Sequence, residues 1–226
     1  PLNHFVGTAI GRADMLDRIS RQNTELARQS RRIAGLQRET QGAFQVSVGL
    51  LARAAELHDE DTGNHILRVN EYSYMVARLL RQPAEWCKEI RYSAALHDVG
   101  KMSVDAAVLK KRGGLDPAER EEINRHSEYG WLILKDHPRL GMAAEIAYCH
   151  HEKWDGTGYP RRLAGEDIPL SARIVQLADI YDALRSARPY KPAFTHEHAV
   201  RILTVGDDRI RPERDFDPRL TAVFAR

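Results

Sequence analysis

The sequence predicts an all-α fold, and three features lead to that prediction. Apolar residues recur at helical spacing along most of the chain, several short motifs that start helices are present, and no stretch shows a convincing alternation of apolar and polar residues. No internal repeat is visible. We therefore expect a compact domain of about seven or eight helices, with one long helix at its N-terminal end.

The first predicted helix is long and polar. Residues 11–45 are rich in Arg and Gln and contain no Pro, and apolar residues stand at seven-residue spacing at Ile19, Leu26 and Ile33. The positions of a second coiled-coil seam are polar, at Asn23, Ser30 and Gln37. The pattern favours two alternatives equally, a helix that pairs with a second copy of itself and a solvated helix that links two domains.

The later helices are indicated by stripes of residues at helical spacing and by N-cap motifs that start a helix. Residues 65–82 carry one stripe made of Ile66, Val69, Ser73, Val76 and Leu80.

Two further segments begin alike. Asp116 is an N-cap followed by Pro117 and then Glu119, and Asp217-Pro218 repeats the start of this pattern. Residues 168–186 are apolar almost all the way round, which is typical of a buried helix.

Composition excludes several classes of protein. The 226 residues are enough for a sizeable core. The net charge of +2 is too small to give the overall positive potential that would attract a nucleic acid polymer. No apolar run approaches the roughly 18 residues of a membrane span. The two cysteines make a disulfide scaffold unexpected, so we expect a cytoplasmic location. Because the chain begins at Pro1, we expect it to be part of a longer protein.

The buried helix at 168–186 carries an unexpected polar stripe. Its members are Gln176, Asp179, Asp182 and Ser186. A carboxylate buried there costs several kcal/mol unless a cation or a metal ion faces it. We therefore expect positive charge opposite Asp179.

Histidines elsewhere provide further metal-binding groups. His97-Asp98 continues an apolar stripe inward, the pair His150-His151 precedes a glycine-rich turn, and His65 and His126 belong to other helices. Taken alone, such a histidine is more often a packed core residue. Imidazoles and carboxylates without thiolates suit Fe, Mn, Zn or Ni. A carboxylate between histidines also suits two ions about 3.5–4 Å apart, an arrangement that activates water for attack on phosphate.

The motifs that contain these residues resemble a known family. From about residue 48 to 224 the chain is similar to the HD-GYP domain, a subgroup of the HD phosphohydrolases. The matching stretches are DEDTGNHILRV, ALHDVGK, NRHSEYG, HHEKWDGTGYP, GEDIPLSARIVQLADIYDALRSARPYK and FDP. The resemblance implies a helical fold with a central metal site, and hydrolysis of cyclic di-GMP to pGpG and in some members on to GMP. It divides the chain into a linker or signalling helix, 1–45, and a catalytic domain, 46–226.

The resemblance also implies a ligand set. The family's metal ligands fall on His65, His97, Asp98, His126, His150, His151 and Asp179, with Asp98 as the bridging carboxylate. Members with three metals have a Glu four residues before the first histidine, where this chain has Asp61. The resemblance therefore leaves two or three divalent ions open. Iron or manganese is expected, with zinc or nickel as alternatives.

The remaining site residues follow from the same motifs. Lys101 is expected to contact phosphate and to act with His97 and Asp98 in catalysis, while Tyr159 lines the pocket. Arg188 and Lys191 of ARPYK are expected on the side of the second phosphate.

These motifs leave three functions to compare. The first is a phosphodiesterase acting as the output module of a bacterial signalling protein. The second is a regulatory module that binds cyclic di-GMP or another protein with little or no turnover. The third, a general HD nucleotidase, is disfavoured by the GYP and ARPYK segments. We also expect a homodimer through the N-terminal helix, and an upstream sensor or receiver domain that is absent from this chain.

Overall fold

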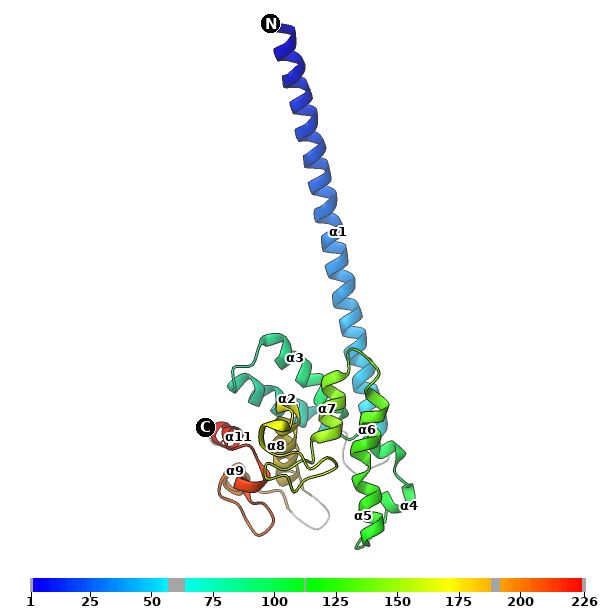
Figure 1. Ribbon diagram of the computed structural model, residues 1–226, viewed down its shortest axis with the longest axis vertical. Coiled ribbons are helices and arrows are strands. Elements are labelled where there is room, and N and C mark those ends of the chain that lie inside the picture. Colours follow the sequence, from blue (N-terminus) through cyan, green and yellow to red (C-terminus); the bar gives the residue numbers. More distant parts are fainter. Residues whose placement is uncertain (1, 57–63, 112, 188–191, 225–226) are drawn as a thin grey trace. The chain divides into compact units, whose positions relative to one another are not determined.

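The computed structural model describes residues 2–56, 64–111, 113–187 and 192–224, with side chains described from residue 15 onward except that of Glu56. These ranges form eleven α-helices and three 3-10 helices (η) and contain no strand, which confirms the all-α prediction. In chain order the elements are α1 (Leu2–Glu56), α2 (His65–Leu79), α3 (Ala84–Ser93), η1 (Ala94–Leu96), η2 (Val99–Ser103), α4 (Ala106–Leu109), α5 (Pro117–Asn124), α6 (His126–Leu134), α7 (Gly141–Cys149), η3 (Gly165–Asp167), α8 (Leu170–Arg185), α9 (His196–Val205), α10 (Pro212–Asp215) and α11 (Pro218–Phe224) (Figure 1).

The number of helices exceeds the expected seven or eight for a physical reason. Two of the helices, α4 and α10, are single turns of four residues, which are too short to show a periodic stripe. In addition, α5 and α6 are separated only by Arg125, so that a break falls within one continuous helical pattern.

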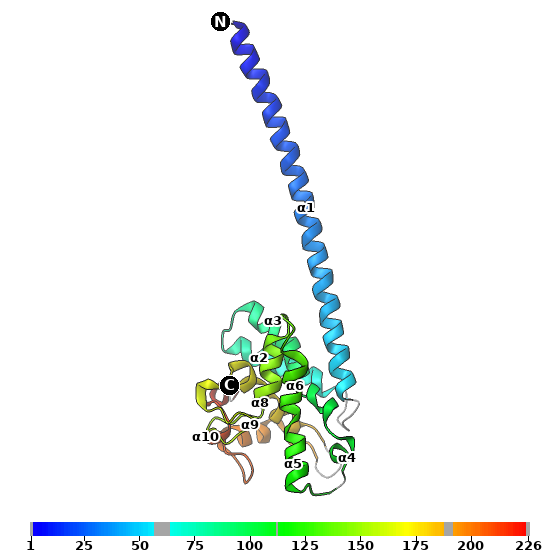
Figure 2. The ribbon, with the colours of Figure 1, turned by 45° about the vertical axis from the view of Figure 1, so that its right-hand side comes forward.

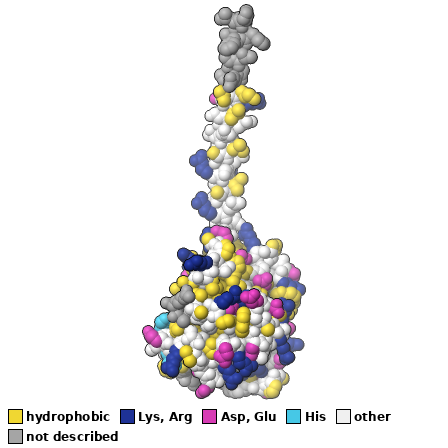
Figure 3. Space-filling model, turned by 60° about the vertical axis from the view of Figure 1, so that its left-hand side comes forward, with side chains coloured by type: hydrophobic (Ala, Val, Ile, Leu, Met, Phe, Trp, Pro, Cys, Tyr) yellow, Lys and Arg dark blue, Asp and Glu magenta, His cyan; other side chains and the backbone are white. Residues whose placement is uncertain are grey.

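The chain divides into two compact units, residues 1–47 and 48–226. The first unit is formed by α1 as far as residue 47, and the last residues of this helix belong to the second unit. The side chains of Ile19, Leu26 and Ile33 are exposed there, and Figure 3 shows hydrophobic side chains at intervals along this helix. The division into a signalling helix and a catalytic domain at residue 45 stays a prediction.

The core of the second unit is built around α8. This helix contacts α2, α7 and α9, and the side chains of Ile174 and Leu177 on it are fully buried. The predicted stripe on α2 is also confirmed, since Ile66, Val69 and Val76 are buried. Figure 1 shows α6 and α7 side by side, and these two helices contact each other; Figure 2 shows α5 and α6 following one another.

Two predicted helix starts are present as expected. The Asp116 carboxylate accepts a hydrogen bond from the Glu119 N–H at 2.9 Å, and the Glu119 carboxylate accepts one from the Asp116 N–H at 2.9 Å. This capping box satisfies two N–H groups at the start of α5. At the other start, α11 begins at Pro218, directly after Asp217.

A tight segment brings His97 and Asp98 against α6. The chain leaves α3, winds through η1, passes His97 and Asp98, and winds again through η2. A Cβ atom on Gly100 would lie 1.9 Å from the carbonyl oxygen of His126 and 2.4 Å from the nitrogen of Gly130. Only glycine allows η2 to lie this close to the backbone of α6, so Gly100 sets the approach of Asp98 to His126.

None of the helices in the described part of the chain is long and apolar enough to cross a membrane.

Candidate metal centre

The predicted ligands lie in two adjacent groups. The first group is Asp98, His126, His150 and His151, and the second is His65, His97 and Asp179; within each group the potential ligand atoms lie within 4.8 Å of one another. Asp61, the predicted ligand of a third ion, lies outside the described residues.

Helix ends supply most of these side chains. His65 is the first residue of α2 and His126 the first residue of α6, while His150 and His151 directly follow α7. Asp179 instead lies within the buried helix α8. Sequence positions more than a hundred residues apart are therefore brought together at the meeting point of several helix termini.

Asp98 connects the two groups through its two carboxylate oxygens. Its Oδ1 lies 3.3 Å from Nε2 of His126 and 3.6 Å from Nε2 of His150. Its Oδ2 lies 3.3 Å from Nε2 of His97, which belongs to the other group. Each oxygen thus faces a different set of nitrogen atoms, which is the arrangement that a carboxylate bridging two ions requires.

Three of the histidines are held by hydrogen bonds on the far side of their rings. In each, Nδ1 lies within hydrogen-bonding distance of a backbone carbonyl oxygen three or four residues earlier: His97 with Ala94 at 2.9 Å, His126 with Ile123 at 2.6 Å, and His150 with Ile146 at 3.0 Å. A carbonyl only accepts, so Nδ1 carries a proton and Nε2 is the nitrogen left to face a metal ion. Metal-binding histidines are commonly oriented in this way.

The Nε2 atom of His97 provides a test of whether these residues fit a metal ion. It is buried and, although it lies 3.3 Å from Oδ2 of Asp98, it makes no hydrogen bond with any described residue. A buried polar atom without a partner is costly, and a metal ion would satisfy it. The nitrogen and oxygen donor set around it is one that borderline first-row metals accept.

His65 is oriented by a carboxylate and not by its own backbone. Its Nδ1 lies 2.8 Å from Oδ2 of Asp182, and its Nε2 lies 3.4 Å from Oδ1 of Asp179. Asp182 is in turn held by Arg68, whose Nε and Nη2 donate to its two oxygens at 2.6 and 2.9 Å.

This role of Asp182 was missed in the sequence, although the residue was noted in the polar stripe. The available signal was its spacing, because Asp182 follows Asp179 by three residues as Arg68 follows His65 by three.

The protonation of two histidines suits metal binding. Burial, with the neighbouring His150 and His126, holds the pKa of His151 well below its usual range. Burial likewise lowers the pKa of His126 to about 4. Both imidazoles are therefore neutral at pH 7, which is the form that binds metals.

The carboxylates make the centre negative. Burial opposes ionisation of Asp98, but Lys101 and His97 outweigh it and hold its pKa well below the usual range. Burial also lowers the pKa of His97, but the carboxylates of Asp98 and Asp179 raise it to about 9. Without a metal ion, the cluster therefore attracts a proton to the place where a cation fits.

Two predicted substrate residues lie beside this centre. Nζ of Lys101 is 2.8 Å from Oδ2 of Asp98. The ring of Tyr159 stacks on that of His151, with centroids 4.7 Å apart and planes 27° apart. Burial raises the pKa of Tyr159, so its hydroxyl stays protonated. Arg188 and Lys191 lie outside the described residues.

A family model described as "HD domain" matches residues 49–215. The chain belongs to the HD domain family. The similarity to the HD-GYP group is confirmed by curated relatives of this HD domain. A cyclic di-GMP phosphodiesterase from Vibrio cholerae serotype O1 is 41% identical over 83% of this chain and 40% of its own length. From the same organism, a 3'3'-cGAMP-specific phosphodiesterase 2 is 40% identical over 77% of this chain and 33% of its own length.

The HD domain also resembles solved structures. A structure of an HDG"Y"P protein from Bdellovibrio bacteriovorus superposes with a TM-score of 0.59 at 18% identity, covering 83% of this chain and 63% of that one. At this identity the likeness shows the shared helical fold. The chain spans less than half the length of the two curated relatives.

Proposed function

We propose that this HD domain is a metal-dependent phosphodiesterase that hydrolyses cyclic di-GMP to pGpG, with GMP as a further product. The observation that carries the proposal is the placement of Asp98, whose two oxygens face two separate groups of histidines. Two curated relatives are named as cyclic dinucleotide phosphodiesterases, which favours hydrolysis over a regulatory module without turnover.

The metal centre in this proposal holds two divalent ions, iron or manganese. Asp98, His126, His150 and His151 would hold one, and His65, His97 and Asp179 the other, with Asp98 shared between them. When bound, such a pair activates a water for in-line attack and neutralises charge on the phosphate. A third ion held by Asp61 remains a prediction from sequence.

The chain's own residues bind and orient the substrate. Lys101 has its ammonium group beside Asp98, where it would donate hydrogen bonds to a nonbridging phosphate oxygen and stabilise the charge that develops there. Tyr159 offers a ring at the edge of the metal centre, on which a guanine or ribose would pack. Arg188 and Lys191 would bind the second phosphate.

A second candidate substrate comes from the comparisons. The two relatives have nearly equal identity to this chain, yet one is named for cyclic di-GMP and the other for 3'3'-cGAMP. Both cyclic dinucleotides have two phosphates and at least one guanine, so the same metal centre suits each.

The test is hydrolysis of both dinucleotides by the chain prepared without oxygen and loaded separately with Fe(II) and Mn(II). We expect pGpG from cyclic di-GMP, and no product from the variant His97→Ala. His198→Ala is the matched control, because His198 is exposed, stacks on Phe194 and belongs to neither group of potential ligands. Absence of turnover of either dinucleotide by a fully loaded wild-type chain would contradict the proposal.

We further propose that the chain acts in the cytoplasm as a homodimer formed through α1. The apolar residues Ile19, Leu26 and Ile33 are 45%, 62% and 56% exposed, and their seven-residue spacing suits a coiled coil with a second copy. Sedimentation equilibrium should give the mass of a dimer. A monomer at tens of micromolar would contradict this part of the proposal.

A further inference from the structure

Glu152 directly follows the paired histidines, and its side chain is fully buried. Its Oε1 accepts a hydrogen bond from the N–H of Arg161 at 2.7 Å, and its Oε2 accepts one from the N–H of Leu163 at 3.0 Å. Its own carbonyl oxygen accepts from Nε2 of Gln176 on α8 at 2.6 Å. A buried carboxylate is therefore bound by the backbone of a segment nine to eleven residues further along the chain.

The segment between these contacts folds back directly over Glu152. A Cβ atom on Gly158 would lie 2.4 Å from Cα of Glu152 and 2.3 Å from the nitrogen of Lys153, so any larger residue would displace the chain. Arg162, between the two N–H donors, has a positive φ of 56° that turns both donors toward the same carboxylate. The loop from residue 152 to 163 is thus closed by the Glu152 side chain.

Tyr159 is the residue that this closure places against the metal centre. Its N–H donates to the carbonyl oxygen of His151 at 3.3 Å, and its ring stacks on the imidazole of His151. It also meets the ring of His126 edge-on, with centroids 6.4 Å apart. Because Tyr159 stands between Gly158 and the residues bound by Glu152, its position depends on both.

We propose that Glu152 is a positioning residue that fixes Tyr159 beside the metal centre for contact with substrate. The contact with a cyclic dinucleotide rests on the proposed function, whereas the placement of Tyr159 does not. The Glu152 carboxylate accepts hydrogen bonds from backbone N–H groups of this loop, and it acts through Tyr159. Three of the predicted metal ligands are oriented by backbone carbonyl oxygens that lie outside this loop, so we expect bound metal to be retained when Glu152 is replaced.

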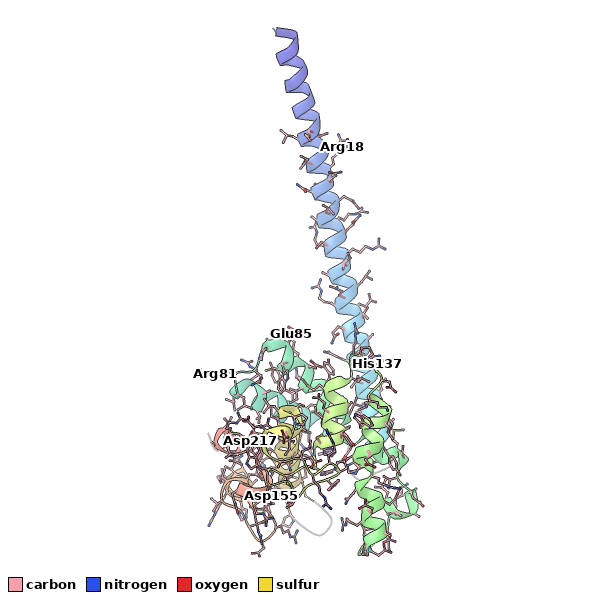
Figure 4. All side chains as sticks on the ribbon, viewed as in Figure 1. Arg18, Arg81, Glu85, His137, Asp155 and Asp217 are labelled. Carbon is pink, nitrogen blue, oxygen red and sulfur yellow. The ribbon has the colours of Figure 1, made fainter. Side chains whose placement is uncertain are left out.

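The same loop offers a matched control. Asp155, labelled in Figure 4, is exposed; its Oδ2 accepts from Nε of Arg214 at 2.7 Å, and its Oδ1 accepts from the Thr157 hydroxyl at 2.6 Å. Asp155→Asn makes the same chemical change as Glu152→Gln, on the same loop, without touching the bonds to Arg161 and Leu163.

The first arm of the test measures placement by hydrogen–deuterium exchange. Glu152→Gln replaces one acceptor oxygen by an amide group that itself donates, so one backbone N–H loses its partner. We expect faster exchange in peptides covering 158–163, with manganese content equal to wild type, and wild-type exchange there in Asp155→Asn. Unchanged exchange in Glu152→Gln would overturn the proposal, as would loss of metal. If Glu152→Gln does not fold by circular dichroism, Glu152→Asp, which keeps the charge but is one methylene shorter, takes its place.

The second arm measures the consequence for substrate by a double-mutant cycle. Loss of one stacking contact is expected to raise KM for cyclic di-GMP about tenfold in Glu152→Gln while kcat stays within about twofold. In the background of Tyr159→Ala, adding Glu152→Gln should change KM no further. Effects that multiply in the double variant would overturn the proposal. A wild-type chain without turnover would refute the proposed function, and the exchange arm would still decide the placement.

Discussion

Replacing Asp182 by Asn tests whether the residues that orient His65 support the metal centre. Asp182 is 1% exposed, accepts hydrogen bonds from Nε and Nη2 of Arg68, and faces Nδ1 of His65. Removing one partner of a fully buried ion pair costs about 3–5 kcal/mol. The Arg68 side chain is 35% exposed, so water solvates part of the charge left behind. We therefore expect a loss of about 2 kcal/mol in the free energy of unfolding.

The effect on metal binding is separate from that on stability. In Asp182→Asn one acceptor oxygen is replaced by an NH2 group, which cannot accept a hydrogen bond from Nδ1–H of His65. The orientation of the His65 ring is therefore less well fixed. Losing such an outer partner typically lowers metal affinity by about 10- to 100-fold. Competition of Mn(II) binding against a chelator measures the affinity, and urea unfolding of the metal-free chain measures the stability.

The matched control is Asp17→Asn on α1. Asp17 also pairs with an arginine, Arg21 at 2.6 Å, but both side chains are mostly exposed. This variant should keep wild-type metal affinity and nearly wild-type stability. If Asp182→Asn loses stability but binds Mn(II) within about twofold of wild type, Asp182 supports the fold only, and our account of its action on His65 is refuted.

Three further predictions concern the surroundings of the centre. Asp217 pairs with Arg173 at 2.6 Å, so Asp217→Asn leaves the Arg173 side chain as an uncompensated buried charge. Urea unfolding should show a loss of about 3 kcal/mol in the free energy of unfolding, and an unchanged midpoint would contradict this. Gly158→Ala should lower kcat/KM more than about tenfold with bound metal retained, because its Cβ would lie 2.3 Å from a backbone nitrogen; wild-type kinetics would show that the loop adapts. The hydrogen bonds from Thr157 and Arg214 lower the pKa of Asp155 from 3.8 to about 2, so its stabilising effect is complete above pH 4 and is lost as pH falls through 2. The free energies of unfolding of Asp155→Asn and wild type should therefore differ above pH 4 and converge near pH 2. A difference that stays constant with pH would contradict this role of the Asp155 carboxylate.

The fold class and the ligand types could be predicted from sequence because both leave periodic signals. The stripe of Ile66, Val69 and Val76 is readable as one helix face, and a carboxylate at position 179 within an apolar helix requires a partner. Sequence spacing also showed that His97 points inward.

Other features depend on close contacts between segments that are separate in the sequence, and only the folded chain defines these contacts. The sequence does not show that the two oxygens of Asp98 face different histidines, since this follows from the contact of η2 with α6 at Gly100. The bonds of Glu152 to Arg161 and Leu163 are equally hidden, because they are made to backbone N–H groups, which every residue except proline carries.

The central claim is that Asp98 joins two metal sites into one centre. The most direct measurement is electron paramagnetic resonance of the anaerobically prepared chain loaded with Mn(II), together with a metal count on the same sample. We predict at least two manganese ions per chain and a spectrum of exchange-coupled ions, which Asp98→Ala converts to that of isolated ions. A single manganese per chain, or two that give only the six-line signal of isolated Mn(II), would contradict the account.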